Sequence, residues 1–288
     1  MIICKKVAYA LFILLLVVST AEAQEESWYE YARLFTYSPR YFGPNAFPLP
    51  ELRSGRLSNY YEVEVRGEYH FFKGDQTKDL YGRLFIPVAE SRAGLEVSFI
   101  FYEYYNMTPE TVAERHAAGQ SWNEGARGDV IVSSFYKLFK DNKWADILCE
   151  ATLKTASGNR LADARHTDAA SYWFDFNIGR FLMKNTDASS FIRIQGLAGF
   201  YCWMTNDIVH RQNDAFLYAA GLSLGYKNLT VQADIVGFKG YLNNGDRPLI
   251  LRSMLNFTCK KNRLSLRYKQ GVHDFLYDTW SLAYIRCF

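Results

Sequence analysis

A two-residue alternation runs through most of the chain and restricts its fold more than any other feature. Between residues 61 and 71 the odd positions are uncharged, while the even positions are charged or are histidine. Successive side chains of a β-strand point to opposite faces, so this stretch predicts a strand with one apolar and one ionised face. Eleven further segments carry an uncharged row at alternate positions, and Arg286 is the only charge on these rows. They are residues 80–86, 95–101, 130–138, 145–153, 172–178, 192–200, 216–224, 229–235, 249–257, 264–268 and 278–288, and the row of the last segment begins at Trp280.

The last of these segments has the dimensions of a strand that crosses a membrane. Its uncharged row begins near Trp280 and ends at Phe288, so aromatic rings mark both ends. A strand needs about 9 to 11 residues to cross a bilayer, and aromatic rings gather at the two interfaces. Arg286 is tolerable on this row because a charge costs little near the interface. The segment resembles the closing strand of Gram-negative outer-membrane β-barrels, which commonly ends in Phe, although Arg286 departs from the usual apolar residue.

The connections between the segments alternate in length. Residues 104–127, 155–171 and 204–214 form long polar loops, whereas residues 140–143, 227–228 and 260–262 form short turns on the other side. Long loops on one side and short turns on the other are typical of outer-membrane barrels. The prediction is an all-β, antiparallel, up-and-down transmembrane β-barrel of about 12 strands, in the bacterial outer membrane, with both termini periplasmic.

The start of the chain resembles a secretory signal peptide. Lys5 and Lys6 precede an apolar run from residue 7 to residue 18, and Ala21-Glu22-Ala23 fits a cleavage site, so the mature chain is expected to begin at Gln24. Loss of two lysines and one glutamate lowers the formal net charge from +3 to +2. Such a small charge argues against nucleic acid as a partner. The expected division is a signal peptide over 1–23, an irregular segment over 24–58 and the barrel over 59–288.

The segment 24–58 is rich in aromatic residues and proline. Four of the seven prolines lie at positions 39, 44, 48 and 50, and they prevent a regular strand ladder. Two interpretations follow. The segment is either a periplasmic tail or a plug inside the lumen, where its aromatic rings are shielded from water.

The row opposite each uncharged row is expected to face the lumen. Its charges have both signs, so they predict no strong anion or cation preference. They form either a paired network that stiffens the wall or an eyelet whose field orients a polar solute. These predicted inward-facing charges are Glu62, Glu64, Arg66, Glu68, Arg83, Glu96, Asp129, Lys137, Glu150, Lys154, Asp175, Arg193, Asp234, Arg252 and Arg267.

The longest loop contains a helix signal. Thr108 suits an N-cap, Pro109 suits the first helical position, and Gly119 could end the helix. The helix is either a lid folded into the mouth or part of an exposed loop.

The histidines of the sequence give little indication of a catalytic site or a metal site. Outer-membrane acyl hydrolases carry His-x-Ser on one strand face, and none of the five histidines here fits that motif. The nearest cluster is His166 with Asp163, Thr167 and Asp168, in a loop. No two histidines share a strand at alternate positions, so no metal or cofactor is predicted. The four cysteines after the leader are expected to be free thiols, because a strand separates Cys259 from Cys287.

One further resemblance covers residues 128–158. Gly128-Asp129-Val130, two strands and Leu153-Lys154-Thr155-Ala156-Ser157-Gly158 are similar to a run in phenol-degradation-pathway transporter barrels, without the usual Pro. The resemblance implies a 12-stranded small-molecule channel and carries over no functional residue.

The sequence therefore predicts a channel or facilitator for a small solute. Two alternatives stay open, which are an outer-membrane lipid or acyl-chain enzyme and a closed structural or adhesion barrel. The expected partners are outer-membrane lipid, the barrel assembly machinery and an unnamed small solute.

Overall fold

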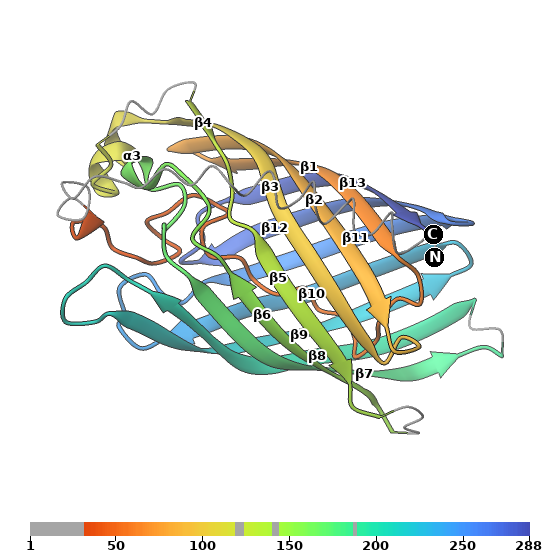
Figure 1. Cartoon of the computed structure of the whole chain (residues 1–288). Coiled ribbons are helices and arrows are strands. Elements are labelled where there is room, and N and C mark those ends of the chain that lie inside the picture. Colours follow the sequence, from red (N-terminus) through yellow and green to blue (C-terminus); the bar gives the residue numbers. More distant parts are fainter. Residues whose placement is uncertain (1–31, 119–123, 140–143, 187–188) are drawn as a thin grey trace, which may run out of the picture.

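The computed structural model describes residues 32–118, 124–139, 144–186 and 189–288. Twelve antiparallel strands form one closed ring, because β1 pairs with β13 and β2 pairs with β3 (Figure 1). The ring strands are β1 Glu62–Phe72, β2 Asp75–Val88, β3 Ala93–Met107, β5 Ile131–Lys137, β6 Asp146–Lys154, β7 Ser171–Lys184, β8 Ser190–Met204, β9 Gln212–Tyr226, β10 Leu229–Gly240, β11 Leu249–Cys259, β12 Asn262–His273 and β13 Asp278–Cys287. The short strand β4 Glu124–Ala126 pairs with β3 outside the ring.

The outward face of the ring is apolar. Val65 on β1, Leu266 on β12 and Leu282 on β13 are all exposed, while the residues between them along each strand are more buried. Gly67 lies opposite Leu282, and Leu282 lies opposite Leu266, so the uncharged rows of neighbouring strands are in register. One closed ring with apolar side chains outside is a barrel and not a pair of stacked sheets, which confirms the predicted fold class.

The strand ends differ slightly from the prediction. β3 continues to Met107, and β12 continues to His273 instead of ending at residue 268. Arg286 lies at the short-turn end, where its Nη1 donates to Asn262 Oδ1 at 2.7 Å. The four cysteines of the described chain are free, and β12 separates Cys259 on β11 from Cys287 on β13.

The long loops gather at one end of the barrel. The predicted helix is α3, Pro109–Glu114, and the hydroxyl of Thr108 accepts a hydrogen bond from Thr111 N as its N-cap. Its C-cap is Arg115, so the helix ends before Gly119, which lies outside the described residues. A 3₁₀ turn, Leu161–Asp163, lies in the loop between β6 and β7. Within the described residues, no helix is long and apolar enough to span a membrane.

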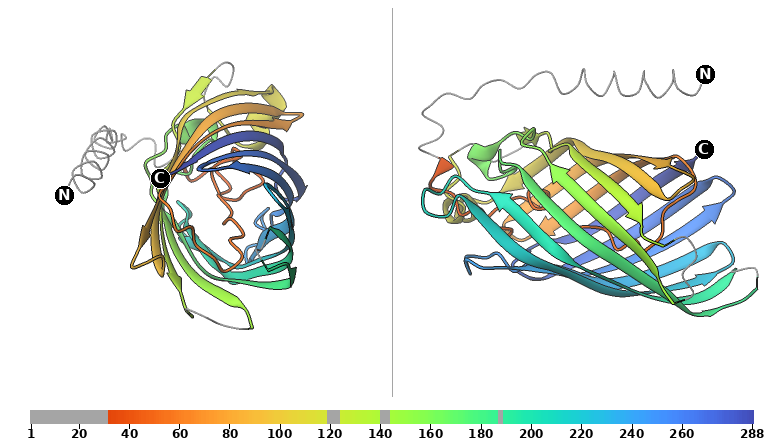
Figure 2. Two further views of the ribbon diagram at one scale, coloured as in Figure 1. Left: turned by 90° about the vertical axis from the view of Figure 1, so that its right-hand side faces the viewer. Right: turned by 60° about the horizontal axis from the view of Figure 1, so that its bottom comes forward.

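Residues 32–61, which we call the plug, run through the lumen from the long-loop end to the short-turn end (Figure 2). At the long-loop end, Trp203 Nε1 donates to Tyr37 O at 2.8 Å. Midway, Arg252 Nη1 donates to Pro50 O at 2.9 Å. At the short-turn end, Phe288 N donates to Tyr61 O at 3.0 Å. The signal peptide and the start of the segment 24–58 lie outside the described residues.

Part of the inner wall is apolar, unlike the ionised inner face that the sequence led us to expect. Trp173, Tyr201, Trp203 and Phe238 on β7, β8 and β10 are buried in one cluster with aromatic residues of the plug. Phe47 of the plug lies edge-on to Trp203, with the ring centroids 5.6 Å apart. The plug therefore shares a hydrophobic core with this half of the barrel.

Candidate functional site

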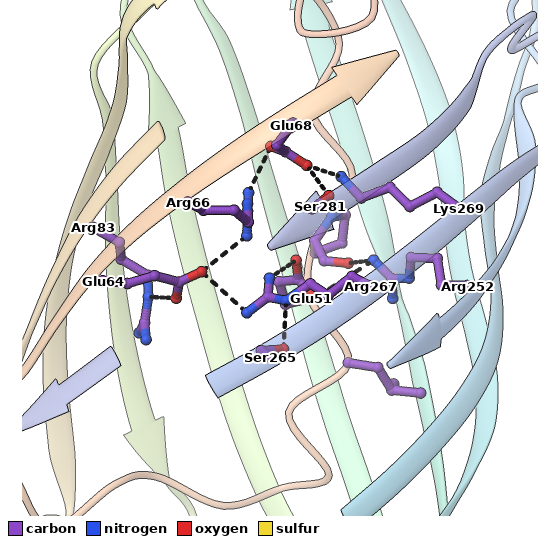
Figure 3. A network of polar contacts seen from close by, with 12 residues as sticks. Glu51, Glu64, Arg66, Glu68, Arg83, Arg252, Ser265, Arg267, Lys269 and Ser281 are labelled. Carbon is purple, nitrogen blue, oxygen red and sulfur yellow. Dashed lines mark hydrogen bonds and ion pairs between the residues drawn. The ribbon is translucent and has the colours of Figure 1, made fainter. Parts of the chain in front are cut away.

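The other half of the lumen holds a network of ion pairs (Figure 3). Glu64 on β1 accepts hydrogen bonds from Arg83 Nε at 2.8 Å and from Arg66 Nη1 and Arg267 Nη2 at 3.1 Å each. Register explains part of this contact, because Glu64 lies directly opposite Arg83 across β1 and β2. Glu68, on the same row of β1, accepts from Lys269 Nζ at 3.3 Å and from Ser281 Oγ at 2.7 Å.

Arg83 connects three carboxylates of the wall. Its Nη2 lies 2.7 Å from Glu62 Oε2, and its Nη1 lies 2.8 Å from Glu96 Oε2, in addition to the bond with Glu64. Each of these carboxylates is almost fully buried and has a guanidinium partner. Buried charges need such partners, so this part of the wall is a satisfied network.

The plug adds one charge of each sign to this network. A carboxylate oxygen of Glu51 lies 3.8 Å from Arg252 Nη1, and the other lies 3.6 Å from Arg267 Nη1. Arg53 Nη2 lies 2.6 Å from Glu96 Oε1, and Arg53 Nε lies 3.8 Å from Glu150 Oε2. The two plug charges therefore contact different parts of the wall.

A cavity of about 130 Å³ lies beside these two plug residues. Its polar lining includes Arg66, Glu96, Glu150 and Lys269 from the wall. Its apolar lining includes Phe47, Ile131, Trp173, Val236 and Ile250. An apolar pocket with a few converging charges is the usual form of a small-molecule site.

A second ion-pair cluster holds the long loops over the mouth. Arg165, in the loop between β6 and β7, pairs with Asp75 on β2, and its Nε lies 2.7 Å from Glu103 Oε1 on β3. Arg115, just after α3, lies 2.8 Å from Asp75 Oδ2 and donates to Tyr277 Oη at 2.8 Å. We call Arg165, Arg115, Asp75, Glu103 and Tyr277 the loop clamp. All five residues are buried.

The loop clamp also touches the plug. Asn45 Nδ2 donates to Glu103 Oε2 at 2.7 Å and to Asp79 Oδ2 at 2.8 Å. Burial raises the pKa of the Tyr277 phenol, while the guanidinium of Arg115 opposes that rise. The phenol therefore stays protonated at neutral pH and donates to Asp75 Oδ2 at 2.6 Å.

One group of side chains has the composition of a metal site. A ligand atom of each of Glu68, His70 and Asp79 lies within 4.8 Å of the others. However, His70 Nε2 lies 2.8 Å from Asp79 Oδ2, and Glu68 is already paired with Arg66 and Lys269. The positive charges of Arg66 and Lys269 would repel a divalent cation at this position.

The structure separates the predicted inward-facing charges into groups. One group forms the network and the cavity lining, namely Glu62, Glu64, Arg66, Glu68, Arg83, Glu96, Glu150, Arg252 and Arg267. Asp175 lies opposite Glu150 in register, and Asp234 pairs with Arg252 at 2.6 Å.

The remaining predicted charges lie apart from this group. Lys154 Nζ lies 2.8 Å from Asp129 Oδ2 near the long loops. Arg193 Nη2 lies 2.6 Å from Asp146 Oδ2, and Lys137 is at the end of β5 near the short turns.

Sequence reasoning missed several charges that the structure brings into the lumen, including Asp75 and Glu103, which lie beyond the predicted ends of β2 and β3. Lys269 was missed because the strand was ended at residue 268, although it lies two positions after Arg267 on the same row. Glu51, Arg53 and Arg165 lie outside the strands, so no periodic pattern indicates where they point.

The histidine cluster in the loop has no catalytic geometry. His166 is buried, with Nδ1 3.7 Å from Asp129 Oδ2 and Nε2 3.9 Å from Glu103 Oε2. Within the described residues, neither ring nitrogen has a hydrogen-bond partner. The hydroxyl of Thr167 instead accepts from Lys154 Nζ at 3.0 Å and donates to Ala169 O at 3.1 Å.

Comparisons with known proteins support the fold. No family model matches the sequence, and no curated protein matches it. The COG4313 outer membrane channel from Pseudomonas putida F1 has a similar structure, with a TM-score of 0.62, 9% identity, and coverage of 84% of this chain and 100% of that chain. The NanC porin has a TM-score of 0.50, 11% identity, and coverage of 78% of this chain and 99% of that chain. The fold is that of outer-membrane β-barrels, as predicted.

Proposed function

We propose that this protein is an outer-membrane channel or facilitator for a small solute. The observation that carries the proposal is the way in which the lumen is filled. The plug has no regular strand between residues 32 and 61, and it contacts the wall through side chains and single hydrogen bonds. A segment held in this way can move while the ring of strands stays closed.

Ion current tests this proposal directly. The full chain, refolded from detergent into planar bilayers, is expected to give discrete current steps when the plug moves. Barrel folding is checked by the difference in electrophoretic mobility between heated and unheated samples. A folded protein that leaves the bilayer silent at all voltages contradicts the channel.

A closed structural or adhesion barrel is the second candidate. The plug favours it, because aromatic residues of the plug are buried against the wall. In that case the plug would be a permanent core, and no current would flow. The acyl-chain enzyme has no comparable observation in its favour.

The orientation in the membrane is also a proposal. We place the short turns and the carboxyl terminus in the periplasm, with the outward rows in contact with outer-membrane lipid. Insertion by the barrel assembly machinery stays a prediction. Because the plug begins at the long-loop end, Ala32 then lies toward the cell exterior. Cleavage after Ala23 leaves eight residues before Ala32, which extend to at most about 29 Å.

This reach is shorter than the 15-residue strand β3, which measures about 50 Å along its length, so it is too short to return to the periplasm through a filled lumen. We therefore expect the mature amino terminus to lie outside the cell, in contrast to the initial expectation of two periplasmic ends. An epitope inserted after Gln24 should be labelled by antibody on intact cells, whereas one added after Phe288 should require permeabilised cells. Labelling of the first epitope only after permeabilisation would restore the periplasmic assignment.

A further inference from the structure

Two charges of the plug, Glu51 and Arg53, lie against walls of opposite sign. We call Arg66, Arg252, Arg267 and Lys269 the cationic wall, and Glu96, Glu150 and Asp175 the acidic wall. Glu51 lies within 4 Å of two members of the cationic wall, and Arg53 lies within 4 Å of two members of the acidic wall. Between Glu51 and Arg53 only Leu52 intervenes, so a short stretch of chain spans both walls.

Two of the three acidic-wall residues, Glu150 and Asp175, have no cation partner on the wall, whereas Glu96 pairs with Arg83 at 2.8 Å. Glu150 and Asp175 lie directly opposite each other across β6 and β7, and both are almost fully buried. Asp175 accepts from Asn177 Nδ2 at 2.6 Å, while Glu150 accepts from Trp173 Nε1 and from Thr152 Oγ1. Among the described residues, Glu150 Oε2 and Asp175 Oδ2 have no hydrogen-bond partner. Two buried carboxyls on facing positions of neighbouring strands carry negative charge more easily when a cation lies beside them, and Arg53, 3.8 Å from Glu150, partly supplies one.

The cationic wall has the complementary imbalance. Its four cations pair on the wall with three carboxylates, Glu64, Glu68 and Asp234, and Glu51 adds a fourth negative charge. Arg66 is almost fully buried, and its Nε has no hydrogen-bond partner among the described residues. Arg252 Nη2 also has none. Unused donors on this wall fit a carboxylate better than a neutral group.

The cavity adjoins both walls. Its lining includes Arg66, Arg252 and Lys269 from one wall and Glu96 and Glu150 from the other. Glu51 and Arg53 also line the cavity, so they stand between the walls and the open space. A solute that reaches both walls must displace these two side chains. Its own charges would then replace theirs.

We propose that the lumen selects small zwitterionic solutes, which carry a carboxylate and an ammonium group at separate ends, as amino acids and short peptides do. The carboxylate contacts the cationic wall, the ammonium contacts the acidic wall, and an apolar middle part lies against Trp173 and Ile250. Glu51 and Arg53 hold these positions until a solute of matching charge displaces them. This inference rests on the proposed channel function and adds the solute class.

The test compares four small probes with different charges at their ends. One is zwitterionic, one carries only a carboxylate, one carries only an ammonium group, and one is uncharged. Full-length protein in liposomes is loaded with radiolabelled glycylglycine, N-acetylglycylglycine, glycylglycinamide or N-acetylglycinamide, and efflux is measured at zero membrane potential. Loss of one charged hydrogen bond corresponds to a factor of about ten, so glycylglycine should leave about tenfold faster than either singly charged analogue. Efflux of the uncharged probe provides the reference.

Two variants assign each wall to one end of the solute. Glu150→Gln should remove the advantage of glycylglycine over N-acetylglycylglycine and keep its advantage over glycylglycinamide. Arg252→Gln should have the opposite effect. Lys137→Gln changes a charge at the short-turn end and should alter neither ratio. If a variant does not fold, the comparison of probes on the unchanged protein still decides.

The outcomes separate the two proposals. Equal efflux of all four probes, or the fastest efflux for a singly charged probe, overturns the zwitterion inference and leaves the channel intact. A bilayer without ion current and liposomes without efflux of any probe overturn the channel, and the zwitterion inference with it.

Discussion

Replacing both Phe42 and Phe47 by alanine is expected to raise the ion current through the folded barrel. Phe42 is fully buried, and its ring centroid lies 5.7 Å from that of Phe47, which in turn contacts Trp203. Each buried Phe→Ala change costs about 3 to 5 kcal/mol. Loss of even about 3 kcal/mol of docking energy raises the undocked fraction of the plug more than about 100-fold.

The measurement is the mean current in planar bilayers, with heat-modifiable electrophoretic mobility as the check on folding. Leu34→Ala is the matched control, because Leu34 lies in the same segment but is 57% exposed. It should leave the current unchanged. A double variant that folds and conducts like the unchanged protein would show that the plug does not limit the current.

Replacing Arg165 by methionine is expected to destabilise the protein by about 3 to 5 kcal/mol, because it leaves buried carboxylates short of positive charge. Arg165 pairs with Asp75 and Glu103, donates to Thr77 Oγ1 at 2.7 Å, and lies over the ring of Tyr105 at 4.4 Å. Arg115 still compensates Asp75, so Glu103 bears most of the loss. Loss of the loop clamp should also expose residues 155–170 to protease.

The free energy of unfolding in urea, measured in lipid vesicles, checks this prediction. Arg160→Met is the matched control in the same loop. Arg160 pairs with Glu124 at 2.9 Å and lies 3.8 Å from Asp163, but its side chain is 43% exposed, and a pair made by such an exposed side chain contributes only about 0 to 1 kcal/mol. Equal effects of the two substitutions would contradict the role of the loop clamp.

The presence of a filled lumen could have been predicted from the sequences of the strands. On β8, Ile194 and Phe200 face outward, but Leu197, Tyr201 and Trp203 on the inward rows are apolar as well. A strand that is apolar on both faces is buried on both faces. This pattern indicates a filled lumen and favours the plug over the periplasmic tail, although the prediction for the inward rows rested only on their charged residues.

The ion-pair partners of the plug could not have been predicted in the same way. Glu51 and Arg252 are about 200 residues apart, and Asn45 reaches Asp79 and Glu103 from a segment without regular structure. The two-residue periodicity of a strand gives no information about contacts between residues that lie so far apart in the sequence. Their contacts depend on the path of the plug and on the stagger of the ring, which the local pattern does not encode.

Local patterns in the sequence were enough to predict the antiparallel barrel, its outward apolar rows and its two unequal ends. They were enough because alternation along a strand, aromatic strand ends and turn lengths are local properties that the bilayer selects segment by segment. The entry of the plug into the lumen and the contacts of Glu51 and Arg53 with opposite walls could be seen only in the folded protein. Those contacts form between residues far apart in the chain, and they exist only once the ring has closed around the plug.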